Sequence, residues 1–90
     1  MRGRRLATVA EFYSDQRRPG DYVKVESDDP DAHDRTVWYV CDPLGNVGRL
    51  VHHTVTEHED GTITVSPSIL DSGPGGGWHG FLERGEWRQA

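Results

Sequence analysis

The sequence has little of the material that several classes of protein require. A single cysteine, Cys41, excludes an internal disulfide and any thiolate metal cluster made by this chain alone. No segment approaches the roughly 20 apolar residues of a membrane-spanning helix. The arginines at positions 2, 4 and 5 are not followed by the apolar run of about 7–15 residues that a signal peptide contains. We therefore expect a cytoplasmic protein that does not bind a membrane.

Apolar residues are also scarce. They make up 33% of the 90 residues while 28% are charged and 11 residues are glycine, so the chain has material for one thin core. We expect a single domain over residues 1–90. A homodimer that buries further apolar surface would relieve the shortage.

Positive charge is limited and uneven. The formal net charge is -5, and a negative chain lacks the broad positive surface that nucleic-acid binding requires. Residues 1–18 hold half of the ten basic residues and are expected to form a basic helix or a solvated tail, with contact to an acidic partner as the alternative. The five are Arg2, Arg4, Arg5, Arg17 and Arg18.

One short helix is expected near the start. Leu6, Val9, Ala10 and Tyr13 follow helical spacing and predict a helix over about residues 5 to 16, which Pro19-Gly20 ends.

The rest of the chain has the pattern of short strands separated by turns. The run from Thr36 to Cys41 is β-branched and aromatic, which is typical of a central strand. The turns are expected at 42–45, where Pro and Gly occupy type I positions, at Asp60-Gly61, and at Arg84-Gly85. We predict a mostly β fold, a small antiparallel sheet or sandwich of five to six strands built from hairpins. The strands are expected at 21–26, 36–41, 49–57, 62–69, 78–83 and 86–88.

Ser68 and His79 are the strongest candidates for chemistry. If residues 62–69 pair with 78–83 around a loop centred near 73 and 74, the two residues oppose each other directly, at a Cβ separation of about 4.5–5.5 Å. A serine hydroxyl beside an imidazole is a competent nucleophile. The amides of Gly75, Gly76 and Gly77 could then hold an oxyanion. The alternative is that Ser68 caps a turn, that His79 is a half-buried sheet residue, and that the glycines only connect two strands.

Other kinds of site are less well supported. The glycine loop has no following Lys-Ser or Lys-Thr and joins strand to strand, which excludes a nucleotide loop. Neither metal-ligand spacing nor a cofactor motif is present, and His52 and His53 would point to opposite faces of a strand. We predict no metal and no cofactor. Five aromatic residues are expected mainly in the core, with Trp78 and Phe81 also lining a substrate groove beside His79. The five are Trp38, Tyr39, Trp78, Phe81 and Trp87.

Two motifs carry a family resemblance. The segment Thr62-Ile63-Thr64-Val65-Ser66-Pro67-Ser68-Ile69, then the glycine-rich gap, then Gly77-Trp78-His79-Gly80-Phe81-Leu82-Glu83-Arg84-Gly85-Glu86-Trp87 resembles the small bacterial and phage family called BubE, over about residues 37 to 88. Some members of that family occur in operons for bacterial ubiquitin-like conjugation and have a proposed peptidase role. Many relatives also have cysteines that look like metal ligands, whereas here only Cys41 remains.

The resemblance implies a serine-type hydrolase or peptidase that processes ubiquitin-like proteins, with Ser68 as nucleophile and His79 as general base. Among the acidic residues nearby in the sequence, Asp71, Glu83 and Glu86, none is marked as a third catalytic residue. The rival hypothesis is a noncatalytic phage or bacterial accessory module that binds a protein partner through the glycine loop and the aromatic surface.

Overall fold

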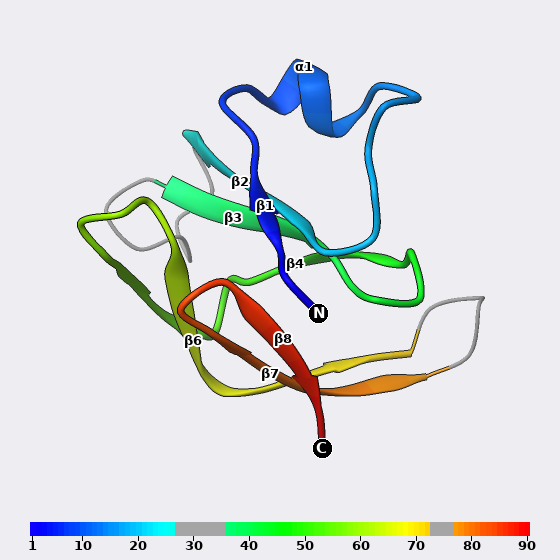
Figure 1. Ribbon diagram of the computed structural model, residues 1–90, viewed down its shortest axis with the longest axis vertical. Coiled ribbons are helices and arrows are strands. Elements are labelled where there is room, and N and C mark those ends of the chain that lie inside the picture. Colours follow the sequence, from blue (N-terminus) through cyan, green and yellow to red (C-terminus); the bar gives the residue numbers. More distant parts are fainter. Residues whose placement is uncertain (27–35, 73–76) are drawn as a thin grey trace.

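The protein is a small β structure of two facing sheets. The computed structural model describes residues 1–26, 36–72 and 77–90, which form eight short strands and one short helix. The strand order is β1-β2-β3-β4 in the first sheet and β5-β6-β7-β8 in the second (Figure 1). The mostly β prediction is confirmed. The elements are β1 (Arg4–Arg5), α1 (Val9–Phe12), β2 (Asp21–Glu26), β3 (Thr36–Cys41), β4 (Val47–Arg49), β5 (Thr54–Glu57), β6 (Ile63–Asp71), β7 (Trp78–Glu83) and β8 (Glu86–Gln89).

The first sheet contains the two strands that the sequence predicts best. β2 and β3 have their predicted bounds and pair antiparallel, with Val23 opposite Tyr39. β3 lies between β2 and β4, so its prediction as an inner strand is confirmed. The turn after it is closed by a hydrogen bond from the Gly45 amide to the Asp42 carbonyl, 2.8 Å long. β1 pairs parallel with β2, which makes this sheet mixed rather than wholly antiparallel.

The N-terminal segment is not the predicted helix or tail of residues 1–18. The helix α1 is only four residues long, and Arg4 and Arg5 are extended in β1. A capping box between Thr8 and Glu11 starts the helix, and its buried side chain is Phe12. Backbone hydrogen bonds to Gly20 and Tyr22 form this strand, and Asp21 of β2 accepts two side-chain hydrogen bonds from Arg4, of 3.1 and 2.8 Å.

The predicted strand over residues 49–57 is divided. β4 ends at Arg49 and β5 begins at Thr54, and the residues between them carry the chain from the first sheet to the second. The hairpin partner of β3 is therefore Val47–Arg49 rather than the whole segment. The division has a packing reason, because Leu50, just after β4, and Val55, in β5, both pack into the core from different ends of this connection.

The second sheet is antiparallel throughout. β5, β6, β7 and β8 follow one another as hairpins, as predicted. The turn between β7 and β8 places Arg84 and Gly85 at φ values of 47° and 78°. Positive φ at both central residues is what a tight type I′ hairpin turn requires, and glycine meets it at no steric cost.

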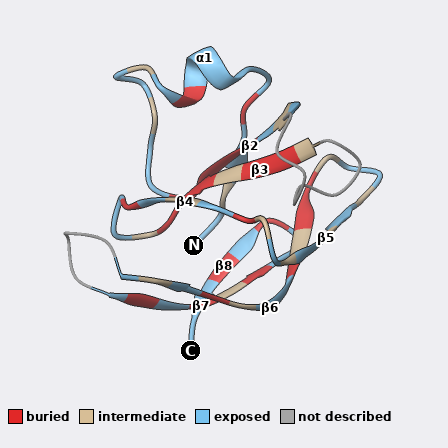
Figure 2. Ribbon diagram, turned by 180° about the vertical axis from the view of Figure 1, so that it is seen from behind, coloured by how far each residue is buried: buried red, intermediate tan, exposed pale blue. Residues whose placement is uncertain are grey.

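The main core lies between the two sheets (Figure 2), and a second, smaller cluster includes Phe12 of α1 and Val23 of β2. All three tryptophans belong to the main core and are at most 5% exposed, which confirms their prediction as core residues. Tyr39 and Phe81 are half-buried instead. The main cluster takes Tyr22 and Val40 from the first sheet, so each sheet supplies apolar side chains to one shared interior.

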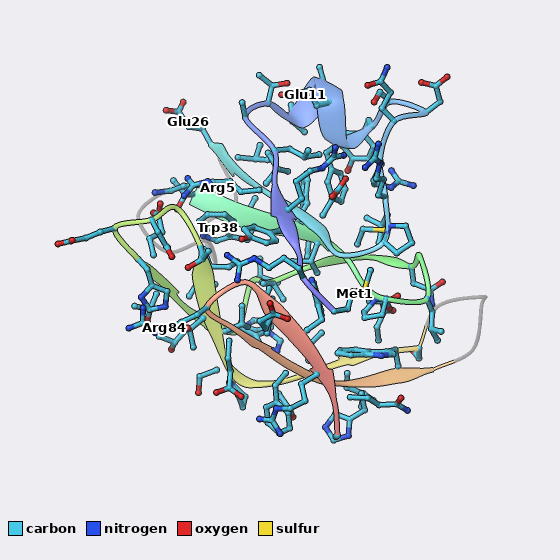
Figure 3. The ribbon with its side chains drawn as sticks, in the orientation of Figure 1. Met1, Arg5, Glu11, Glu26, Trp38 and Arg84 are labelled. Atoms are coloured by element: carbon cyan, nitrogen blue, oxygen red, sulfur yellow. The ribbon has the colours of Figure 1, made fainter. Side chains whose placement is uncertain are left out.

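Charged residues clamp the two sheets at one end. Glu57 of β5 accepts hydrogen bonds from Arg5 of β1, at 3.1 Å, and from Lys24 of β2, at 2.5 Å. The Arg5 guanidinium also lies over the indole ring of Trp38, 4.9 Å from the ring centroid (Figure 3). The basic residues at the start of the chain therefore hold the sheets together rather than forming a solvated tail.

Candidate functional site

The outer face of the second sheet carries the candidate site. Along β7 the buried residues Trp78, Gly80 and Leu82 alternate with His79 and Phe81, which therefore face outward. On β6 the buried Ile69 similarly leaves Ser68 and Leu70 on the outer face. Four side chains from two adjacent strands are thus brought together on an open surface.

Ser68 and His79 are in hydrogen-bond contact. The Ser68 Oγ lies 2.9 Å from the His79 Nε2, and His79 is exposed. When Nε2 is unprotonated, the hydroxyl donates to it, and the imidazole is then placed to take the serine proton. The alternative interpretation, in which Ser68 caps a turn and His79 is a half-buried sheet residue, does not fit, because Ser68 lies within β6 and His79 is exposed.

The two residues are not directly opposite, which corrects the predicted register. Val65 pairs with Leu82, and that register would place Ser68 opposite His79 if it continued. It shifts by two residues before Ile69, which pairs with Gly80, so Leu70 is the residue opposite His79. Ser68 reaches the imidazole as a diagonal neighbour on the same face, where a long side chain can span the greater separation.

Of the three glycines predicted to hold an oxyanion, the structure describes Gly77. Gly75 and Gly76 lie outside the described residues. Gly77 precedes Trp78, which pairs with Asp71, so Gly77 is level with position 72 of the neighbouring strand. Position 72 is four residues from Ser68 along the same chain, which in extended conformation is a distance of roughly 13 Å. The Gly77 amide is therefore too far along the sheet to hold the oxyanion that would form on a substrate carbonyl attacked by the Ser68 Oγ.

The nearby acidic residues do not complete a triad. Asp71 faces the other way from His79, and its Oδ2 lies 3.8 Å from the Cβ position of Gly48 on β4. Glu83 pairs with Arg88, and Glu86 pairs with Arg2. The site is thus a pair of side chains rather than a triad built with one of these carboxylates.

The predicted groove residues lie on opposite sides of the sheet. Trp78 is 5% exposed and packs in the core against Trp87, so it cannot line a groove beside His79. Phe81 does share the outer face, where the Arg88 guanidinium covers its ring at 4.7 Å. Leu70, which the sequence did not single out, is 75% exposed. The apolar surface beside the pair is therefore formed by Leu70 and Phe81.

His53 is the contact that the sequence reasoning missed. It lies in the bend between β4 and β5, and its Nε2 is 3.1 Å from the Ser68 backbone carbonyl oxygen. The side chain also lines a cavity of about 280 Å³, together with Trp38, Leu50 and Val55. The sequence does show the adjacent histidines, but its strand pattern over 49–57 predicts opposed strand faces, whereas residues 52 and 53 lie outside any strand.

The described residues include neither a metal-ligand cluster nor a membrane-spanning helix. Within residues 1–26, 36–72 and 77–90, no three His, Cys, Asp or Glu side chains gather closely enough to hold a metal ion. Cys41 is buried, and burial raises the pKa of its thiol above the ordinary value of 9.0. No helix in the described part of the chain has the length and hydropathy to span a bilayer.

Comparison with known proteins identifies no relative. No family model, curated protein or solved structure matches the chain.

Proposed function

We propose that this protein is a serine-type hydrolase that cleaves an extended peptide segment, with Ser68 as nucleophile and His79 as general base. The observation that carries the proposal is the 2.9 Å contact between Ser68 Oγ and His79 Nε2 on an exposed sheet face. A serine needs an adjacent base to become nucleophilic, and this contact supplies one.

The reaction that this geometry supports is acyl transfer through an ester. His79 Nε2 takes the proton from Ser68 Oγ as the oxygen attacks the substrate carbonyl carbon. The protonated imidazole then gives that proton to the leaving amine, and the peptide C–N bond breaks. Water, deprotonated by the same nitrogen, attacks the resulting ester, and the serine recovers its proton from His79. One amide and one water become an acid and an amine, and the enzyme is unchanged.

The substrate class follows from the openness of the surface. Ser68 and His79 lie on a sheet face rather than in an enclosed cleft, which suits a segment of another protein better than a small molecule. Leu70 and Phe81 provide apolar contacts on either side of the pair. The resemblance of the two motifs to the BubE family favours the C-terminal segment of a ubiquitin-like protein as the peptide.

Labelling by a fluorophosphonate probe tests the proposal. The wild-type protein should gain the probe mass on Ser68, and Ser68→Ala should gain none there. His79→Ala should label at least about 100-fold more slowly, as expected for loss of a general base. Ser66→Ala, on the same strand, and His52→Ala, an exposed histidine outside the site, are the matched controls and should label like wild type. Absence of labelling in wild type, or labelling that persists in Ser68→Ala, overturns the assignment.

A second candidate function is a noncatalytic module that binds a protein partner through this face. The observation that favours it is Leu70, which is 75% exposed next to Phe81 on a flat sheet surface. A second copy of the chain is the partner that can be tested directly, by sedimentation velocity. A dimer that persists in Ser68→Ala and dissociates in Leu70→Asp would support binding through this face. A monomer at every concentration would exclude the homodimer.

A further inference from the structure

The Ser68 backbone lies in an irregular part of its sheet. Val65 pairs with Leu82 of β7, and Ile69 pairs with Gly80. In this described part of the chain, the three residues between Val65 and Ile69 have no register partner on β7. Pro67 is one of the three, and proline has no backbone N–H to donate to a neighbouring strand. A bulge of this kind re-aims the side chains it carries. Ser66 pairs with Thr54 of β5, but the strand register gives neither Pro67 nor Ser68 a partner.

His53 supplies a contact that the sheet ladder does not. Its Nε2 lies 3.1 Å from the Ser68 carbonyl oxygen. Because a carbonyl oxygen can only accept, the proton of this bond belongs to Nε2. The other ring nitrogen, Nδ1, is buried without a hydrogen-bond partner in the described structure. Moving the proton to Nδ1 would bury an unpaired donor and would leave two acceptors, Nε2 and the carbonyl oxygen, facing each other. The surroundings of both ring nitrogens therefore favour the tautomer with the proton on Nε2.

We infer that His53 is a positioning residue for Ser68. Its hydrogen bond holds the carbonyl of Ser68, and a serine side chain has a single heavy-atom torsion with three staggered settings, so the backbone orientation limits Oγ to a few positions. With the peptide held, Oγ faces His79 Nε2 at 2.9 Å. Without the bond, the bulge can rotate and carry Oγ out of hydrogen-bond range. An effect of His53 on the reactivity of Ser68 rests on the proposed function, whereas its effect on the position of the Ser68 Oγ does not.

The variants separate the hydrogen bond from the bulk of the ring. His53→Leu removes the donor and keeps an apolar side chain of moderate size. His53→Gln retains an amide N–H at a reach similar to that of Nε2, and His53→Asn has the same amide on a shorter side chain. The neighbouring His52→Leu is the matched control, because residue 52 is exposed. Folding of each variant is checked from its amide NMR spectrum, and the Asn and Gln pair decides the matter if the Leu variant does not fold.

Two readouts are used on the same proteins. The first is the rate of fluorophosphonate labelling at Ser68, which should fall at least about 10-fold in His53→Leu and His53→Asn, because small misplacements of reacting groups cost large factors. His53→Gln should recover to within about threefold of wild type. The second is the His79 ring-nitrogen spectrum, with Ser68→Ala as the reference for a ring without its serine partner. His53→Leu should move the Nε2 signal toward that reference.

The outcomes distinguish the inference from the proposed function. If wild type labels and His53→Leu labels equally fast, the positioning role is wrong while the hydrolase proposal stands. If wild type does not label, the hydrolase proposal fails and the His79 spectrum decides the positioning role alone. A spectrum that is unchanged between wild type and the folded donor-deficient variants overturns the inference, and a shift toward Ser68→Ala that His53→Gln reverses supports it.

Discussion

The indole ring of Trp78 packs over Gly80, two residues further along the same strand. A Cβ on residue 80 would lie 2.4 Å from the indole Cη2 and 2.3 Å from the Arg88 carbonyl oxygen. The tryptophan can therefore fold inward at this point only because residue 80 has no side chain. With residues 78 and 80 both inward, His79 between them must face outward, toward Ser68.

Gly80→Ala is expected to destabilise the protein for that reason. Overpacking of this kind costs about 1–3 kcal/mol, measured as a lower midpoint of urea unfolding. Gly77→Ala is the control, because its nearest neighbour, the Asp71 carbonyl oxygen, would be at an ordinary 3.6 Å. It should change stability by no more than about 0.5 kcal/mol. Equal stability of the two variants would mean that the space over Gly80 is not restricted.

Glu57 should make the stability depend on pH. Hydrogen bonds from Lys24, and then from Arg5, lower the pKa of its carboxyl below the ordinary 4.5. Since the folded pKa is the lower one, the contribution is present above about pH 4.5 and is lost as the pH falls through the folded value. Glu57→Gln should therefore be less stable than wild type at pH 7, by about 0.5–1 kcal/mol for a partly exposed pair, and the difference should shrink toward pH 3.

Urea unfolding at pH 7, 5 and 3 measures this difference. Glu59→Gln is the matched control, because Glu59 is exposed, and it should follow wild type at each pH. If Glu57→Gln loses the same free energy of unfolding at pH 3 as at pH 7, the loss comes from altered packing or hydrogen bonding rather than from the missing charge.

The ion pair of Arg4 with Asp21 should be asymmetric in its response to mutation. The Asp21 side chain is 1% exposed and that of Arg4 is 45% exposed. Arg4→Met leaves a buried carboxylate with the Arg18 amide at 2.8 Å, and should cost about 2–3 kcal/mol. Asp21→Asn removes the charge and leaves Arg4 in solvent, so it should cost less. The double variant should be more stable than Arg4→Met alone, and additive losses would contradict this account.

Cys41 should be chemically inert in the folded protein. Its side chain is 2% exposed, and burial raises the pKa of the thiol, so little reactive thiolate is present. We expect slow reaction with Ellman's reagent at pH 8 and prompt release of one equivalent in denaturing urea. Prompt reaction without denaturant would show that the first sheet opens around β3.

Local patterns predicted the parts of the fold that depend on neighbours in the sequence. β3 has the β-branched run of a strand, and the Arg84-Gly85 turn follows from its residue types. β1 could not be predicted in this way, because Arg4 and Arg5 are in a strand through their pairing with Asp21 and Tyr22 of β2, which are distant in the sequence. The division of the 49–57 segment likewise depends on which sheet each half packs against.

The sequence predicted the part of the site that depends on the local pairing of β6 with β7. The antiparallel pairing of β6 with β7 brings Ser68 and His79 to one face, and this pairing can be predicted from two strand patterns joined by a short loop. The two-residue shift after Val65 is invisible to a pattern of alternating residues, so the predicted direct opposition and the placement of Gly77 both failed. His53 reaches Ser68 from a bend that the sequence presents as a continuous strand.

The contacts of the first residues with the last strand determine when this fold can be completed. The Trp87 amide donates to the Met1 carbonyl, the Gly3 amide donates to the Gly85 carbonyl, and the Arg2 and Glu86 side chains pair across 84 positions of sequence. During synthesis residues 1–3 are made well before β8, so these contacts cannot form until β8 is available. These contacts close a very long loop, and folds dominated by such non-local pairings form slowly, in milliseconds to seconds. Until β8 is made, Met1 and Gly3 lack the backbone hydrogen-bond partners that they have in the folded protein.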